Sequence, residues 1–312
     1  MRWLLVLLLL ASASFADVTR KQTVTSQFMG ASEGTTTQYY SGDHHATEST
    51  MRWTSGFMKT ASGGKPVESG TIVRLDKQVV WTLSPKDKTY QEMTFAEFRD
   101  MMKKGITEAN QAQQEHPDTV AEEMYSWTVQ DKSDSQAKVI HGWNCKNVDL
   151  EATGVNKKDS LDKVVITINL WNSSDVPGVK EMADFNLRYM QALGLGQEAL
   201  TPGLNQASLL YQKQFSQLIE ASKKAPGEPV QSLMEIKHYQ LKGPDIGKAV
   251  GEGVKNELMG KLPFGKKKAA APEKPVYDWN VKFSTTSELT EATMSAVDAA
   301  KFEIPAGYKL KK

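Results

Sequence analysis

The stretch "TIVRLDKQVVWTLSPKDKTYQEMTFAEF", residues 71–98, predicts three short β-strands followed by a helix. Val79, Trp81 and Leu83 share one face of the middle strand, and turns at residues 76–78 and 84–88 separate it from its neighbours. Turns this short join antiparallel strands, because parallel neighbours need a long crossover connection. The stretch therefore predicts an antiparallel sheet.

The helix after these strands begins with a capping box, in which Thr94 and Glu97 each satisfy a backbone amide group of the other. Its apolar residues then recur along one stripe at helical spacing. They are Phe95, Phe98, Met101, Met102, Ile106 and Ala109. The helix therefore has one apolar side, and Pro117 ends it.

The rest of the chain has the same character, with many short strands and a few helices. Strands are predicted at residues 18–29, 35–41, 44–53, 125–130, 136–141, 146–151, 163–171, 230–241 and 276–289, and helices at residues 179–195 and 204–224. Residues 54–70 are rich in Gly and Ser and predict a loop. Strands and helices that come in blocks indicate an α+β fold rather than alternating βαβ units.

The first sixteen residues predict a cleaved secretory signal peptide. Arg2 precedes an apolar run at residues 3–11, which is too short to span a bilayer, and small residues follow it. We expect residues 17–312 to form a single exported domain in a bacterial periplasm, with secretion as the alternative.

Charge and cysteine content limit the possible partners and the source of stability. The chain has 38 Lys and Arg against 37 Asp and Glu, a net charge of +1. This balance provides no long-range field to attract nucleic acid. Cys145 is the only cysteine, so no internal disulfide can form and buried apolar surface must hold the fold together.

Two clusters of polar residues resemble catalytic sites. In "DHH", residues 43–45, adjacent side chains on a strand point to opposite faces, which favours a solvated turn over a metal or general-base site. In "HGWNC", residues 141–145, an extended strand would separate His141 from Cys145 by ~13 Å. Cys145 is then a small buried apolar residue. No established catalytic motif occurs, and we expect no catalytic residue, metal or cofactor.

Residues 243–275 stand apart from the strand pattern. Ile246, Val250, Val254 and Leu258 repeat at every fourth position, as in an amphipathic helix that contacts a membrane surface. Glycines within the repeat each cost about 1 kcal/mol relative to Ala in a helix. This cost favours a flexible insertion with at most a marginal helix over a helix that contacts a membrane surface. The insertion could also contact an envelope protein.

The aromatic and methionine residues leave two interpretations open. Trp53, Trp81, Trp143 and Trp171 lie on predicted strands, beside the Phe- and Met-rich helix. They either line a cavity for an apolar ligand, for which flexible Met side chains are suited, or form a filled core.

Three segments resemble known bacterial proteins. "TMRWTS" (residues 50–55) followed by "TIVRLDKQVVWTLSPKDKTYQEM" (residues 71–93) resembles the central strands of the periplasmic lipoprotein-carrier superfamily, a group of Lol-like half-barrels. "FEIPAGYKLKK", residues 302–312, is similar to the end of a bacterial exported family of unknown function, of the domain of unknown function 4412 type. That family is placed near the carriers.

The resemblance implies an unclosed antiparallel β-barrel, a curved sheet with helices packed in its concave side. In the carriers this hollow holds lipoprotein acyl chains, and by position Arg52, Trp53, Val79, Trp81 and the helix at residues 95–102 would face it. This chain departs from the carriers by having Asp76-Lys77 where they have Asp-Gly, and by its insertion at residues 243–275.

We therefore expect a non-enzymatic periplasmic protein that binds a lipid, an acyl chain or another hydrophobic small molecule. The residues expected at the hydrophobic site are Arg52, Trp53, Val79, Trp81, Phe95, Phe98, Met101, Met102 and Trp143. One alternative is an envelope scaffold with a filled core that displays residues 243–275. The other is a metal-dependent hydrolase that uses Asp43 and its neighbours.

Overall fold

The computed structural model describes residues 17–28, 30–101, 104, 124–194, 212–222, 227–241 and 277–311. The predicted signal peptide, Met102 and the segment 243–275 lie outside the described residues.

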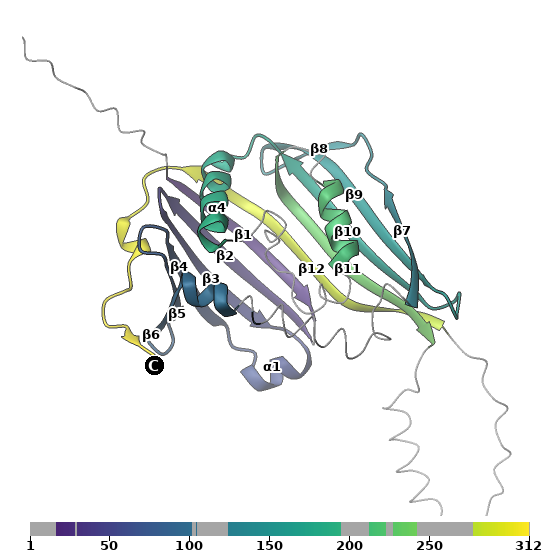
Figure 1. Ribbon diagram of the computed structural model, residues 1–312, viewed down its shortest axis with the longest axis horizontal. Coiled ribbons are helices and arrows are strands. Elements are labelled where there is room, and N and C mark those ends of the chain that lie inside the picture. Colours follow the sequence, from purple (N-terminus) through teal and green to yellow (C-terminus); the bar gives the residue numbers. More distant parts are fainter. Residues whose placement is uncertain are drawn as a thin grey trace, which may run out of the picture.

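The strands of the described residues form one large open sheet of 13 strands (Figure 1). In pairing order they are β13 (Lys309–Leu310), β6 (Thr89–Thr94), β5 (Val79–Ser84), β4 (Val67–Arg74), β3 (His44–Trp53), β2 (Ala31–Ser41), β1 (Val18–Gln27), β12 (Tyr277–Met294), β11 (Glu228–Leu241), β10 (Lys163–Ser173), β9 (Trp143–Asn156) and β7 (Tyr125–Asp131). β8 (Ala137–Ile140) pairs with β9 beside this row. Neighbours pair antiparallel, except for the parallel pair of β13 and β6.

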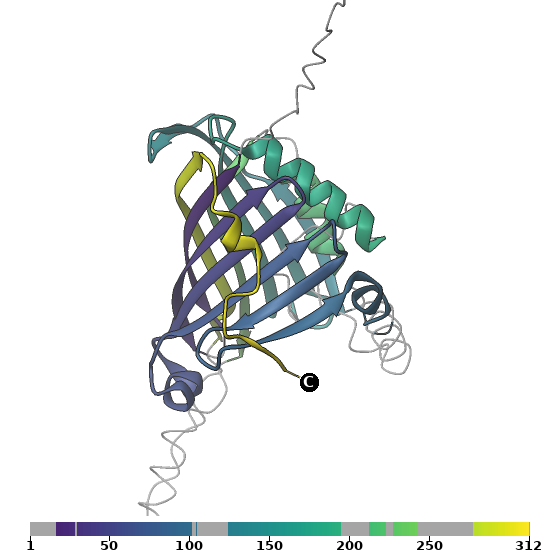
Figure 2. The same ribbon diagram turned by 90° about the vertical axis from the view of Figure 1, so that its left-hand side faces the viewer.

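The sheet is curved and has two distinct faces (Figure 2). Its concave face, here called the inner face, carries α4 (Val179–Leu193), α6 (Gln212–Ser222) and the helical residues 95–101. The opposite face is here called the outer face. The predicted α+β fold, a curved antiparallel sheet with helices in its concave side, is confirmed.

One inner core lies between α4 and the first strands. Phe185 of α4, Phe95 of the helix that follows β6, and Val18, Tyr40 and Val73 of the sheet are all buried in it. The sequence permits this close approach at Gly178, which precedes α4 with φ 75°. A Cβ there would lie 2.5 Å from a Val18 methyl carbon, so only glycine fits without displacing β1.

A second inner core lies under α6 at the other end of the sheet. Leu218 of α6 is fully buried against Leu150, Ile166 and Ile236, from β9, β10 and β11. Residues 163–168 of β10 alternate between half-buried and buried, as expected for a sheet with a helix on one face.

The C-terminal segment covers part of the outer face. The 3-10 helix η3 (Ala299–Phe302) buries Phe302 against Ala46, Ile72, Val79 and Trp81. In Figure 2 this segment crosses the strands on the side away from α4. Parts of both faces of β3–β5 are therefore covered by other segments of the chain.

The prediction that residues 54–70 form a loop is wrong in part. It contains the short helix α1 (Gly56–Ser62), and β4 already begins at Val67. α1 buries no residue, so it has no apolar stripe that would mark it as a helix in the sequence. None of the helices among the described residues is long and apolar enough to cross a membrane.

Candidate functional site

The aromatic helix lies on the inner face, as expected for a helix that covers a concave sheet. Its capping box is present: the Thr94 amide donates to the Glu97 carboxylate at 2.7 Å, and the Glu97 amide donates to the Thr94 hydroxyl at 3.2 Å. Phe95 is buried and Phe98 half-buried in the core beneath α4. Met101 is 50% exposed.

Other residues predicted for the same site lie on the outer face. Val79 and Trp81 pack against Phe302, whereas Val80, between them, packs in the core beneath α4. Arg52 is exposed and forms an ion pair with Glu33. These residues therefore do not share a surface with Phe95 and Phe98.

Trp143 belongs to a third group, where the β8–β9 hairpin folds against the edge of the sheet. It is half-buried against Cys145, Ile140 and Val230. Cys145 is fully buried, as predicted, and burial raises the pKa of its thiol. His141 contacts Glu288 at 2.6 Å.

Trp53 lies beside exposed apolar residues on the inner face. Trp53 and Met51 are two residues apart on β3 and therefore share a face, and Met51 pairs directly with Val67 of β4. Met51 is 44% exposed and Val67 51% exposed. We call Met51, Trp53 and Val67, together with the exposed Phe28 whose ring contacts Phe283, the inner apolar patch.

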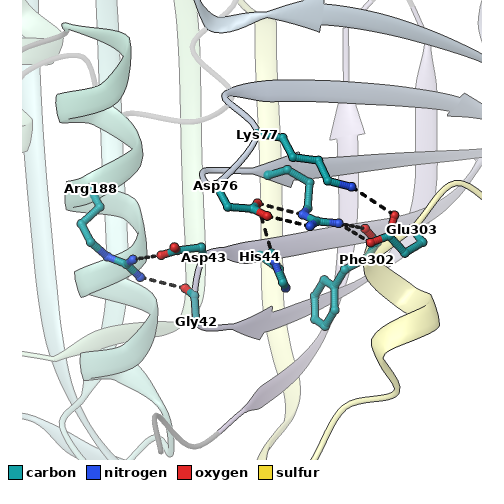
Figure 3. A network of polar contacts seen from close by, with 9 residues as sticks. Gly42, Asp43, His44, Asp76, Lys77, Arg188, Phe302 and Glu303 are labelled. Atoms are coloured by element: carbon teal, nitrogen blue, oxygen red, sulfur yellow. Dashed lines mark hydrogen bonds and ion pairs between the residues drawn. The ribbon is translucent and has the colours of Figure 1, made fainter. Parts of the chain in front are cut away.

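The two adjacent histidines lie in different environments, as strand geometry predicts. His44 points to the outer face, 3.6 Å from Asp76 and beside Phe302 (Figure 3). His45 points to the inner face and stacks on Tyr40 with ring centroids 4.4 Å apart. Burial lowers the pKa of His45 to about 4 and raises the pKa of Tyr40 to about 12.

Asp43 has a structural partner. Arg188 of α4 donates to the Asp43 carboxylate, and to the Gly42 carbonyl at 2.8 Å (Figure 3). These contacts tie α4 to the β2–β3 turn. Asp43, His44 and His45 therefore face three different sets of partners and do not converge on one point.

Arg74 is the centre of a larger polar network on the outer face (Figure 3). Its guanidinium is buried and donates to both oxygens of Asp76, at 2.9 and 2.7 Å, and also to the Glu303 carboxylate and the Phe302 carbonyl. The hydrogen bonds from Arg74 lower the pKa of Asp76 to about 2. The network fastens the C-terminal segment to β4.

A His–Asp–Tyr cluster that the sequence analysis missed lies at the opposite end of the sheet. The Asp162 carboxylate accepts hydrogen bonds from Tyr125 at 3.1 Å and Asn156 at 2.8 Å, and contacts His238 at 2.5 Å. Burial opposes ionisation, but these contacts outweigh it and lower the pKa of Asp162. Asp162 lies in the turn before β10 and His238 lies on β11, far apart in sequence, so no local motif marks them.

The lowered pKa of Asp162 limits the chemistry of this carboxylate. All three partners converge on the Asp162 carboxylate, which orients them. Because their contacts lower its pKa, Asp162 is a poor general base. Within the described residues, no group of three or more His, Cys, Asp or Glu side chains could hold a metal ion.

Comparisons with known proteins add little. No protein-family model matches the chain, and no curated protein matches it. Among solved structures, it is similar to a DUF1329 family protein from Desulfovibrio piger, with a TM-score of 0.22 and 7% identity over 94% of this chain and 91% of that one. A TM-score this low carries no argument about fold or function.

Proposed function

We propose that the protein is a non-enzymatic, exported binding protein that holds a lipid or another apolar chain against the inner face of its sheet. The observation that supports this proposal is the inner apolar patch. Met51 and Val67 are cross-strand neighbours with about half of their surface exposed. Contiguous exposed apolar groups on a concave surface are typical of ligand or partner sites.

The residues proposed to contact the ligand differ from those expected from the sequence. Trp53 stays in the site, Met51 joins it on the same face of β3, and Val67 joins it as the cross-strand partner of Met51. Phe28, which lies against Phe283 of β12, is included as an exposed apolar residue farther along the sheet. Val79 and Trp81 are left out, since η3 already covers them. Met101, exposed at the end of its helical segment, remains a candidate for the rim.

The driving force would be removal of apolar surface from water, worth ~25 cal/mol per Å² before the cost of ordering the ligand. A methionine and an aromatic ring suit ligands of variable shape, because the thioether repacks easily. We also propose that the chain is related to the exported family of the domain of unknown function 4412 type, near the lipoprotein carriers, and acts in the periplasm. The patterns at residues 50–55, 71–93 and 302–312 support this relation.

The proposal is tested by organic extraction of the purified protein followed by mass spectrometry, and by titration with a fluorescent fatty acid. Met51→Asp and Val67→Asp would each place a charge in the patch, and we expect at least about 10-fold weaker binding. Val139→Asp is the matched control, because Val139 is 68% exposed on β8, away from the patch.

Equal binding by the patch variants and the control would contradict the placement of the ligand. Repeated extraction without lipid, together with no response to the probe, would favour the alternative of an envelope scaffold protein.

A further inference from the structure

A hollow on the outer face lies over the middle of the sheet. It has a volume of about 380 Å³, within the range of small-molecule sites. Thr23 and Thr25 of β1, Thr286 of β12 and Asn169 of β10 contribute to its lining. Trp171, Gln231 and Glu288 border it as well.

The hollow is separate from the inner apolar patch. Asn169 and Trp171 alternate along β10 with Ile168 and Leu170, which pack in the core beneath α6. The sheet itself therefore lies between the hollow and the helices, and a ligand here would not touch the inner face.

One wall of the hollow is held in place by the β8–β9 hairpin. Lys138 donates to the Gln231 side-chain oxygen at 2.9 Å, and its ammonium lies 4.0 Å from the Trp171 ring centroid. Gln231 in turn donates to Glu288 at 2.7 Å, and His141 contacts the same carboxylate at 2.6 Å. These contacts fix the side chains before any ligand arrives, which reduces the ordering cost of binding.

The lining contains groups that suit a hydroxyl-rich ligand. Threonine hydroxyls donate and accept hydrogen bonds, and the Asn169 amide does both at once. The part of Trp171 that lines the hollow, beside the face that Lys138 covers, adds an apolar surface against which the C–H face of a sugar ring can pack. The two threonine hydroxyls of Thr25 and Thr286 already contact each other across β1 and β12, so they form a continuous polar floor.

The charge of the hollow argues against an anionic ligand. Its charged lining group is Glu288, and hydrogen bonds from His141 and Gln231 lower the pKa of that carboxyl group, while the Lys138 ammonium at the wall is engaged by Gln231 and the Trp171 ring. An ionised carboxylate repels phosphates and carboxylates. A single carboxylate among threonines is also a poor cation site, since Ca²⁺ takes six to eight oxygen ligands.

We propose that the outer hollow binds a neutral carbohydrate. A sugar ring packs against Trp171, and its hydroxyls exchange hydrogen bonds with Asn169, Glu288 and the threonine floor. The proposal is independent of the inner apolar patch, and either can hold without the other.

The test is calorimetric titration of the full-length protein with three neutral trisaccharides, maltotriose, cellotriose and chitotriose, and with trigalacturonate as an anionic comparator. We expect saturable binding of at least one neutral trisaccharide. Asn169→Ala removes hydrogen-bonding groups and should weaken this binding about 3- to 10-fold. Thr286→Arg should abolish it by filling the hollow.

Thr82→Arg is the matched control, because Thr82 is an exposed strand threonine on β5 and does not line the hollow. It should bind like the wild type. Circular dichroism checks that each variant is folded, and Asn169→Ala still tests the site if Thr286→Arg is not. Binding of none of the neutral trisaccharides, tighter binding of trigalacturonate, or unchanged binding by Asn169→Ala would each overturn the proposal.

Discussion

His44 and His45 illustrate how strongly the direction of one side chain decides its chemistry. The two residues are adjacent, but His44 lies beside Asp76 on the outer face and His45 stacks on Tyr40 on the inner face. Strand alternation correctly excludes a joint site for them. The partner of each residue comes from a distant segment and is not marked in the local sequence.

The burial of His45 predicts a pH-dependent stability. Its folded-state pKa is about 4, below the ordinary value of 6.5, so the unfolded chain takes up a proton first as the pH falls. The free energy of unfolding should therefore decrease from pH 6.5 to about pH 4, by at most about 1.4 kcal/mol per pH unit from this group. Urea unfolding at pH 7, 5.5 and 4.5 measures this slope.

His45→Phe keeps a ring against Tyr40 but cannot take up a proton. Its stability should fall less steeply than that of the wild type between pH 6.5 and 4.5. Parallel slopes for the two proteins would show that His45 does not carry the effect.

Val79 and Trp81 show the limit of alternation as a guide. The sequence correctly places them on one face of a strand, together with Leu83. It does not identify which face points into the concavity, because β3–β5 bury apolar residues on both faces. The outer cover is η3, and it reaches these strands from more than 200 residues away in sequence.

At the scale of elements, the C-terminal segment is held by one buried side chain. Arg74 connects β4 to Glu303 and to the Phe302 carbonyl, directly beside the buried Phe302 ring. The arginine fork satisfies carboxylates on two segments at once, which a lysine cannot do with the same geometry.

Arg74→Met should therefore detach this segment. Hydrogen bonds to charged groups are each worth roughly 1.5–3 kcal/mol, and because Asp76 and Glu303 are partly solvated we expect a loss of about 2 kcal/mol in unfolding free energy. Limited proteolysis should also cut residues 295–311 faster. Both are measured against the wild type.

Arg52→Met is the matched control, because Arg52 forms an ion pair with Glu33 in which both side chains are about half exposed. Its loss should cost less than about 1 kcal/mol. If the two variants are equally stable, the Arg74 network does not anchor the segment.

The elements that carry a local signal were predictable. The strand at residues 44–53 and the capping box at Thr94 have the predicted bounds and contacts. α4 begins at Val179 and ends two residues before the predicted end, at the left-handed Gly194. α1 was missed because it buries nothing, and the outer hollow because its lining comes from four strands.

At the scale of the molecule, the sheet type follows from the sequence but the strand order does not. β1 pairs with β2, its neighbour in sequence, and also with β12 near the other end of the chain. The first pairing follows from a short connection, whereas the second depends on which distant surfaces bury each other best. The inner apolar patch and the outer hollow both depend on such distant pairings, so neither could be derived from local patterns.

The long connection between β11 and β12 gives a last prediction. Leu241 and Tyr277 are paired Cα partners, so the ends of residues 242–276 already lie opposite each other in the sheet. A hairpin loop of two to five residues closes such a pair. Replacing residues 242–276 by a four-residue Gly/Asn turn should therefore leave the sheet intact.

Shortening the connection also lowers the entropic cost of closing this loop on folding, by about 0.6 kcal/mol of free energy for each halving of loop length. Three halvings take the connection from 35 residues to about four, so the shortened protein should be as stable as the wild type or up to about 2 kcal/mol more stable. Urea unfolding of both proteins measures this difference. A loss of several kcal/mol would instead mean that residues 242–276 pack on the fold and contribute to its core. Retained stability with a lost membrane or protein contact would assign the segment a role in display.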